Sequence, residues 1–277
     1  MFLKYYKPSG VFSNSQIRKI GRSLGTSKIG HNGTLDPMAS GLMILATEDD
    51  TKLLQYLKDS KKTYIAQAKL FYSSETLDNY QVDLIEHPKI KIDQAKLQNA
   101  INKVKQYTEQ IPPKVSAKKI NGNRAYDLVR QGVDFSLKKQ KIEIFELELI
   151  DFIESYFTFT IKLQISAGGY VRSVLRDIAQ LLGTHCVMTS LVRTAIGDID
   201  IDGMQEESIQ EIPFEQLIDL PKIDYQESYK KELKNGARIK IQKPNGLYLM
   251  VNKELVLSVG MIEKGFYYPK KVFQERI

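Results

Sequence analysis

The sequence has little cysteine and no long apolar run. Cys186 is the one cysteine among 277 residues, so no disulfide can form within the chain, which suits a reducing compartment. No stretch approaches the roughly 18 apolar residues of a membrane-spanning helix, and the first residues, MFLKYYKPSG, lack the apolar core of a signal peptide. We therefore expect a cytoplasmic protein that is not associated with a membrane.

The common metal and cofactor motifs are also missing. The three histidines, His31, His87 and His185, are far apart and give no zinc-ligand spacing with the single cysteine. No phosphate-binding loop, GxGxxG string or GxSxG string occurs, so nucleotide-cofactor and serine-hydrolase chemistry have no support. We expect neither a metal nor a cofactor.

The charge is unevenly distributed along the chain. The net charge is +7, but residues 114–141 alone carry +6 and residues 230–277 carry +7, whereas residues 195–221 carry −8. A single charged run is usually a solvated face, and the acidic one is interpreted so. Two separate basic segments interleaved with tyrosines favour a phosphate backbone, so nucleic acid is the leading partner.

The length and the hydrophobic patterns predict two domains of mixed structure. Strands are expected at residues 2–6, 42–46, 62–70, 142–150 and 156–165, and helices at 13–25, 49–57, 90–104 and 170–182. Ser13 and Gln16 have the spacing of a capping box at the first helix. The acidic stretch is expected to be a linker, and the last ~48 residues have the short strands and turns of a small barrel.

Residues 30–41 read GHNGTLDPMASG and hold one carboxylate, Asp36, among three glycines. An Asp-Pro pair is typical of a helix start, with Asp36 as the N-cap and Pro37 at the first helical position. That interpretation leaves the glycines unexplained, because such clusters usually mark tight turns or the close approach of a ligand or another backbone.

A second string of interest is QISAGGYVRSVLRDIAQLLG, in which a Gly-Gly turn precedes a helix. Arg172 lies in the first turn of that helix, where a cation opposes the helix dipole at a cost of ~0.3–1 kcal/mol. An anionic partner is therefore expected. The alternative is a surface arginine that pairs with Asp177 or with solvent.

Taken together, these strings resemble the TruB-type tRNA pseudouridine synthases, enzymes that isomerise the T-loop uridine at tRNA position 55. The resemblance covers most of residues 1–200 in family order and rests on KPSG at 7–10, GHNGTLDPMASGLMILATEDDTKLLQYL at 30–57, KTY at 62–64, PPKVSAKKINGNRAYDLVRQG at 112–132, ISAGGYVRSVLRDIAQLLG at 165–183 and TSLVRTAIG at 189–197. The tail, from LKNGARIKI to YYPKKVF, is similar to the family's small C-terminal PUA-type RNA-binding domain.

The resemblance implies three catalytic residues. Asp36 matches the family's catalytic carboxylate, Arg172 the arginine that pairs with it, and Tyr64 the tyrosine that stacks on the uracil. The carboxylate could attack the base, attack the sugar or remove a ribose proton, and the sequence leaves all three open. Apart from the resemblance, Tyr64 would be an ordinary strand aromatic.

The resemblance also implies residues that bind the target. The T-loop uridine must be flipped out to be reached, and His31 matches the histidine that fills the gap left in the base stack. Tyr170 and Leu191 match residues that line the uracil pocket. By themselves, His31 would be a polar turn residue and the other two would be core residues.

The implied fold is α+β, a mixed and largely antiparallel sheet with flanking helices at residues 1–225 as the catalytic domain, followed by a β-barrel-like, PUA-type domain at 226–277. The implied partner is tRNA, through its T-arm, with no obligatory protein partner, and the implied state is a monomer. One departure is the segment 74–81, where Asp78 keeps an acidic position of the family but a turn glycine is missing.

Two alternatives belong to other classes. A non-catalytic tRNA chaperone would need basic surfaces but not Asp36, Tyr64 and Arg172 together. A relative that depends on a guide RNA and a protein scaffold would not act alone.

Overall fold

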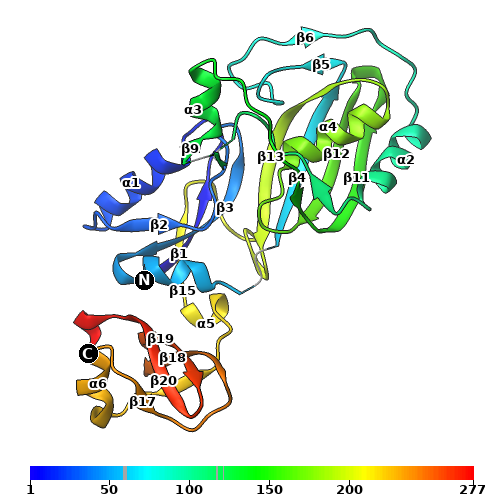
Figure 1. Ribbon diagram of the computed structural model, residues 1–277. Coiled ribbons are helices and arrows are strands. Elements are labelled where there is room, and N and C mark those ends of the chain that lie inside the picture. The colour runs from blue at the N-terminus through cyan, green and yellow to red at the C-terminus, as the bar shows by residue number, and fades with distance from the viewer. Residues whose placement is uncertain (59–60, 117, 121) are drawn as a thin grey trace. The chain divides into compact units, whose positions relative to one another are not determined.

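Figure 1 shows a computed structural model of the chain, which describes residues 1–58, 61–116, 118–120 and 122–277. The string at 112–132 includes Ala117 and Asn121, which lie outside the described residues. The chain forms two compact units, Met1–Ile212 and Pro213–Ile277. Within the described parts, no helix is long and apolar enough to cross a membrane.

The first unit is built on a nine-stranded sheet with the order β11-β12-β4-β13-β3-β1-β15, in which β14 also pairs with β13 and β2 with β3. Its strands are β1 (Phe2–Lys7), β2 (Ile29–His31), β3 (Ser40–Thr47), β4 (Lys62–Leu70), β11 (Ile144–Ile153), β12 (Thr158–Ile165), β13 (Cys186–Ile196), β14 (Ile199–Asp200) and β15 (Ile209–Ile212). Neighbouring strands run antiparallel except β13 and β3, which are parallel. The expected mixed, largely antiparallel sheet is therefore confirmed.

The burial of these strands follows their side-chain patterns. β3 is buried along its whole length, as its continuous apolar run predicts, because strands cover it on both edges and packing covers both faces. β12 alternates strictly between buried and half-buried residues, so one of its faces packs on the core.

Helices pack on this sheet and on its neighbouring ribbon of β8 (Lys119–Ile120) and β9 (Asn123–Arg124). They are α1 (Ser13–Ser23), α2 (Gln94–Val104), α3 (Ala125–Arg130) and α4 (Val171–Leu181), with short 3-10 turns at Glu48–Tyr56 (η1) and Glu154–Tyr156 (η2). α4 packs on β13 and β4, and α2 packs on α4 and β11, as Figure 1 shows. The expected helix at 49–57 is present as the 3-10 segment η1 rather than as an α-helix.

The predicted capping box at Ser13 is wrong. Phe12 occupies the N-cap of α1 and makes no side-chain cap. The Ser13 hydroxyl instead donates to Leu35 O at 2.7 Å and accepts from Leu35 N at 3.1 Å. The hydroxyl is thus engaged by the loop that precedes Asp36, and it ties that loop to α1.

The first unit also contains short two-stranded antiparallel ribbons. They pair β5 (Tyr72–Ser73) with β6 (Ile85–Glu86), β7 (Glu109–Gln110) with β10 (Gln140–Lys141), and β8 (Lys119–Ile120) with β9 (Asn123–Arg124).

The acidic stretch is not simply a linker, contrary to expectation. Its segment β15 pairs with β1 at the edge of the sheet, in a register that sets Glu211 opposite Leu3. Most of the β15 side chains remain exposed. Because only the backbone of an edge strand needs partners, an acidic sequence can pair there without burying charge.

The second unit holds a five-stranded sheet with the order β16-β18-β19-β20-β17. Its elements are α5 (Phe214–Leu217), β16 (Lys222–Asp224), η3 (Glu227–Tyr229), α6 (Lys230–Lys234), β17 (Ile239–Lys240), β18 (Gly246–Asn252), β19 (Leu255–Glu263), β20 (Phe266–Val272) and η4 (Gln274–Arg276). The compact unit begins at Pro213 and includes β16, which pairs with β18, while the domain boundary expected at 225/226 stays a prediction. A sheet is present as expected, while its PUA type stays a prediction.

Candidate active site

The segment around Asp36 is a turn, so the interpretation of Asp36 as a helix N-cap is wrong. Ala39 N donates to Asp36 O at 3.0 Å, and Pro37 takes the second position, where its fixed φ fits a turn. The ammonium of Lys7, which is fully buried, donates to the carbonyls of Pro37 and Ala39 at 3.2 and 2.6 Å. Lys7 therefore supports the turn that presents Asp36.

Gly41 shows why glycines gather near Asp36. Its φ is +111°, and a Cβ added there would lie 2.2 Å from Arg193 O. This is the place where β3 and β13 run parallel, with Arg193 opposite Gly41. Only glycine permits this approach, so the cluster serves close backbone contact as the sequence predicts.

Five of the six predicted site residues line one cavity of about 250 Å³. Asp36 enters from the turn, Tyr64 from β4, Leu191 from β13, and Tyr170 and Arg172 from the N-terminal end of α4. Four chain segments far apart in the sequence thus meet at one concave site, as expected of a binding pocket.

An ion pair lies at the mouth of this cavity. Arg172 Nε is 3.0 Å from Asp36 Oδ2, so the anionic partner expected for this arginine is Asp36 and not Asp177. The guanidinium is almost fully buried, whereas the Asp36 side chain is 37% exposed. Arg172 Nη1 also donates to Thr76 O at 2.6 Å, which fixes the plane of the guanidinium. The carboxylate is held in place and still open to a ligand.

Asp78 adds a second carboxylate on the same arginine. Its Oδ2 is 3.7 Å from Arg172 Nη1, and its Oδ1 accepts from the Thr76 hydroxyl at 2.8 Å and from Tyr80 N at 3.1 Å. The pKa of Asp78 is raised by burial, and these hydrogen bonds and the charge of Arg172 offset only part of the rise. The acidic position kept in the segment 74–81 therefore supports Arg172.

His31 lies apart from the cavity lining, at the end of β2. It is half-buried, and its Nδ1 is buried without a hydrogen-bond partner among the described residues. Burial lowers the pKa of His31, a contact with the Gly33 backbone raises it, and the charges of Arg193 and Lys62 lower it, with a net lowering. The imidazole is therefore biased toward its neutral form.

Sequence reasoning missed two cations in the cavity wall, Lys62 and Arg193. Arg193 is 1% exposed and donates to Leu42 O at 2.7 Å and Gly33 O at 3.1 Å. Both residues stand inside strings of the family resemblance, so their location was available, but nothing in one sequence shows that their side chains face Asp36.

Sequence reasoning also missed Gln110. Its side chain is 2% exposed and brackets the Tyr170 peptide: Nε2 donates to Tyr170 O at 3.1 Å, and Tyr170 N donates to Oε1 at 2.9 Å. Gln110 precedes Tyr170 by 60 residues. A polar residue at the end of a short strand gives no sequence signal for such a contact.

In the described part of the chain, no group of three or more His, Cys, Asp and Glu side chains is placed to hold a metal ion.

Comparisons with known proteins place the chain in a family. The family model described as TruB family pseudouridylate synthase (N terminal domain) matches residues 21–171. A tRNA pseudouridine synthase B of Mycoplasma mobile is 35% identical over 277 residues, which cover 100% of this chain and 96% of the relative. The corresponding protein of Clostridium tetani is 34% identical over 86% of this chain and 85% of its own length. The chain belongs to the TruB family of pseudouridylate synthases.

Solved structures share the fold. The chain matches one in a Cbf5-Nop10-Gar1 complex with a TM-score of 0.68 and 21% identity, over 99% of this chain and 85% of that one. At this identity the likeness concerns the fold alone.

Proposed function

We propose that the chain converts the T-loop uridine at tRNA position 55 into pseudouridine. The observation that carries the proposal is the Asp36–Arg172 pair at 3.0 Å, at the mouth of a cavity walled by Tyr64, Tyr170 and Leu191. The names of the curated relatives, tRNA pseudouridine synthase B, support tRNA as the substrate.

Asp36 is the catalytic group of this proposal. The N1–C1′ bond of the uridine breaks, the uracil rotates, and a C5–C1′ bond forms; a proton leaves C5 and one is gained at N1, so the product is an isomer. A carboxylate can assist by attacking the base, attacking C1′ or removing a ribose proton. Arg172 holds the carboxylate in position for any of the three.

The remaining residues hold the flipped nucleotide. Tyr64 stacks on the uracil, while Tyr170 and Leu191 complete an apolar pocket for it. His31, outside the cavity, fills the gap that the flipped base leaves in the T-loop stack. A neutral imidazole, which its lowered pKa favours, suits stacking between bases.

The decisive experiment measures tritium release from tRNA carrying [5-³H]uridine, because forming a bond at C5 expels that hydrogen. The purified chain alone should release one equivalent from a tRNA transcript, and none from a transcript with cytidine at position 55. A chaperone would bind without release. A guide-dependent enzyme would release tritium only when its RNA and protein scaffold are added. Release by the purified chain alone would also test the proposal that the protein needs no obligatory protein partner.

We further propose that residues 226–277 form a PUA-like RNA-binding domain. The exposed basic residues Lys240, Lys270 and Lys271 lie on the paired strands β17 and β20. Neutralising Lys270 and Lys271 with glutamine should weaken tRNA binding, and each lost phosphate contact should reduce the log–log salt slope by about 0.7–0.9. The same pair of changes at Lys96 and Lys103 on α2, outside both basic segments, is the matched control. An unchanged slope in the tail variant contradicts this role.

A further inference from the structure

The wall of the Asp36 cavity carries more positive charge than Asp36 balances. Lys62, Arg172 and Arg193 all line the cavity. Arg172 is matched by Asp36 and approached by Asp78. Among the described residues, Lys62 and Arg193 have no such carboxylate, so the cavity favours a further anion.

Lys62 is an ammonium without a counter-charge. Among the described residues, no carboxylate lies within 4.0 Å of its Nζ. Burial, together with the charge of Arg193, lowers the pKa of Lys62 to about 8. Holding a desolvated cation unpaired is costly, so the residue is better explained by a ligand that arrives with negative charge.

The lack of a side chain at Gly33 leaves room for Lys62 and Arg193 to lie close together. A Cβ added at Gly33 would lie 2.9 Å from Lys62 Nζ and 3.6 Å from Arg193 Nη1. Arg193 uses Nε and Nη2 on backbone carbonyls, while its Nη1 donates to no described atom. The absent side chain at Gly33 thus leaves an ammonium and a free guanidinium nitrogen close together.

The position of Lys62 relative to Tyr64 suggests what the anion is. Both belong to β4, two residues apart, so their side chains leave the same face about 7 Å apart along the strand. If the ring of Tyr64 meets the uracil, Lys62 lies beyond it by about the length of a sugar. In a nucleotide, that is where the phosphate follows the base.

We propose that Lys62, with Arg193 behind it, binds a phosphodiester group that adjoins the target uridine. This inference rests on the proposed function, since it takes the flipped nucleotide as the occupant of the cavity. The subsite would hold the nucleotide at both ends, with the base at Tyr64 and the phosphate at Lys62, and so set the position of C1′ relative to Asp36.

The test uses a T-arm RNA hairpin in which a neutral methylphosphonate replaces the phosphodiester on either the 5′ or the 3′ side of the target. One of the two replacements should weaken binding and kcat/KM of the wild type by on the order of tenfold to a hundredfold. The same replacement should have less than about a twofold effect in Lys62→Met, because the cation that reads the charge is gone.

Two controls keep the comparison matched. Lys69→Met removes the same charge from the same strand, where Lys69 lies over the Tyr72 ring, and should retain the wild-type response. Lys62→Arg keeps a cation and should retain most of the wild-type response to the methylphosphonate replacement. Lys62→Met should melt no lower than the wild type, since it removes an unpaired charge rather than a packing contact.

The proposal is overturned if neither replacement affects the wild type, a result that needs no variant to fold. It is also overturned if the sensitive replacement weakens Lys62→Met as much as the wild type, which would mean that a group other than Lys62 binds that phosphate. Failure of the proposed function is a separate result: the wild type would bind the hairpin and release no tritium, while the binding measurements would still decide the phosphate contact.

Discussion

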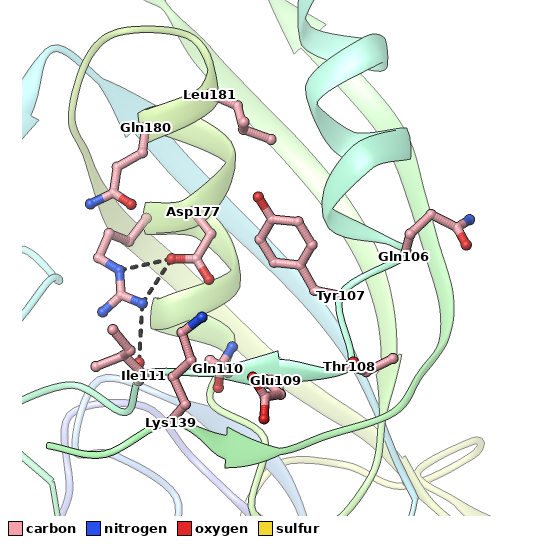
Figure 2. Close-up of a pocket in the computed structure, with 11 residues that line it drawn as sticks. Gln106, Tyr107, Thr108, Glu109, Gln110, Ile111, Lys139, Asp177, Gln180 and Leu181 are labelled. Atoms are coloured by element: carbon pink, nitrogen blue, oxygen red, sulfur yellow. Dashed lines mark hydrogen bonds and ion pairs between the residues drawn. The ribbon is translucent and has the colours of Figure 1, made fainter.

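Two of the cavities beside α4 each contain an arginine of that helix that is paired with an aspartate. The larger, about 630 Å³, is lined by residues 106–111, Lys139 and the second half of α4, and Figure 2 shows it with Asp177 and Ile111 in its wall. The smaller, about 250 Å³, is the Asp36 cavity. Size alone would favour the larger cavity and not the one that we propose as the active site.

The two ion pairs differ in how they are made. Arg176 donates through Nε and Nη2 to Asp177 Oδ1, at 2.9 and 2.7 Å, and also to Ile111 O, so its donors are used on its own neighbour and a carbonyl. Both side chains of that pair are largely buried. Arg172 reaches across 136 residues to Asp36, whose carboxylate stays 37% exposed. A pair that is formed by distant segments and left open to solvent can act on a ligand.

The largest expected effect is a difference in tritium release between substitutions of Asp36 and of Asp177. Asp36→Asn keeps the shape but loses the charge, so tritium release should fall by roughly 10²–10⁴-fold or more while tRNA binding remains. Asp177→Asn, the same change in the larger cavity, should leave turnover nearly unchanged. Sustained product formation by a verified Asp36→Asn protein would remove Asp36 from the catalytic role.

The two arginines give the next contrast. Arg172→Met leaves Asp36 without its partner and without a fixed orientation, so turnover should fall by roughly 100-fold. Arg172→Lys should also be impaired, because an ammonium lacks the planar set of donors that contacts Asp36 and Thr76 together. Arg176→Met should mainly affect stability. Equal losses of kcat in Arg172→Met and Arg176→Met would mean that the loss comes from a disturbance of α4 as a whole and not from loss of the Asp36–Arg172 ion pair.

A smaller effect is expected at Gln110, which lines the larger cavity but holds Tyr170 of the smaller one. Gln110→Leu should lower kcat/KM by roughly tenfold, because both hydrogen bonds to the Tyr170 peptide are lost. Gln110→Glu keeps the acceptor for Tyr170 N and should be intermediate. If the two variants lose stability but keep wild-type kcat and KM, Gln110 is structural only.

The smallest effect concerns pH and stability. Burial lowers the pKa of Lys7 and of Lys62 to about 8 from 10.5. Between these values the unfolded chain binds more protons than the folded chain, so the free energy of unfolding should rise with pH. Urea unfolding at about pH 7 and about pH 10 should show less of this rise in Lys62→Met than in the wild type. An identical rise would mean that Lys62 is more hydrated than its position in the cavity implies.

Much of the first unit could be predicted from patterns of neighbouring residues. The apolar run in β3 and the alternation in β4 and β12 predict strands, because each face of a strand repeats every second residue. The start of α4 after a Gly-Gly turn was also foreseen, and so was an anionic partner for Arg172. These features depend on local geometry and on the helix dipole, which a single segment reveals.

Predictions that gave a polar group a role within its own segment of the sequence were wrong. Ser13 was expected to cap its own helix and instead bonds to Leu35, and Asp36 was considered as an N-cap but lies in a turn. The acidic run of residues 195–221 suggested a linker, yet its segment β15 pairs with β1 at the edge of the sheet. In each case a partner distant in the sequence competed for the same donors and acceptors and was not visible in the local pattern.

By itself, the sequence determined the family, many strands and helices of the first unit and five of the residues that line the Asp36 cavity, because these depend on residue type and spacing. The tertiary structure alone decided that Asp36 remains open beside Arg172, that Gln110 holds Tyr170, and that Lys62 lacks a counter-charge. These properties arise where segments such as β3, β4, β13 and α4 converge. Burial, pairing and the environment of a charge are sums over neighbours in space, and most of those neighbours are remote along the chain.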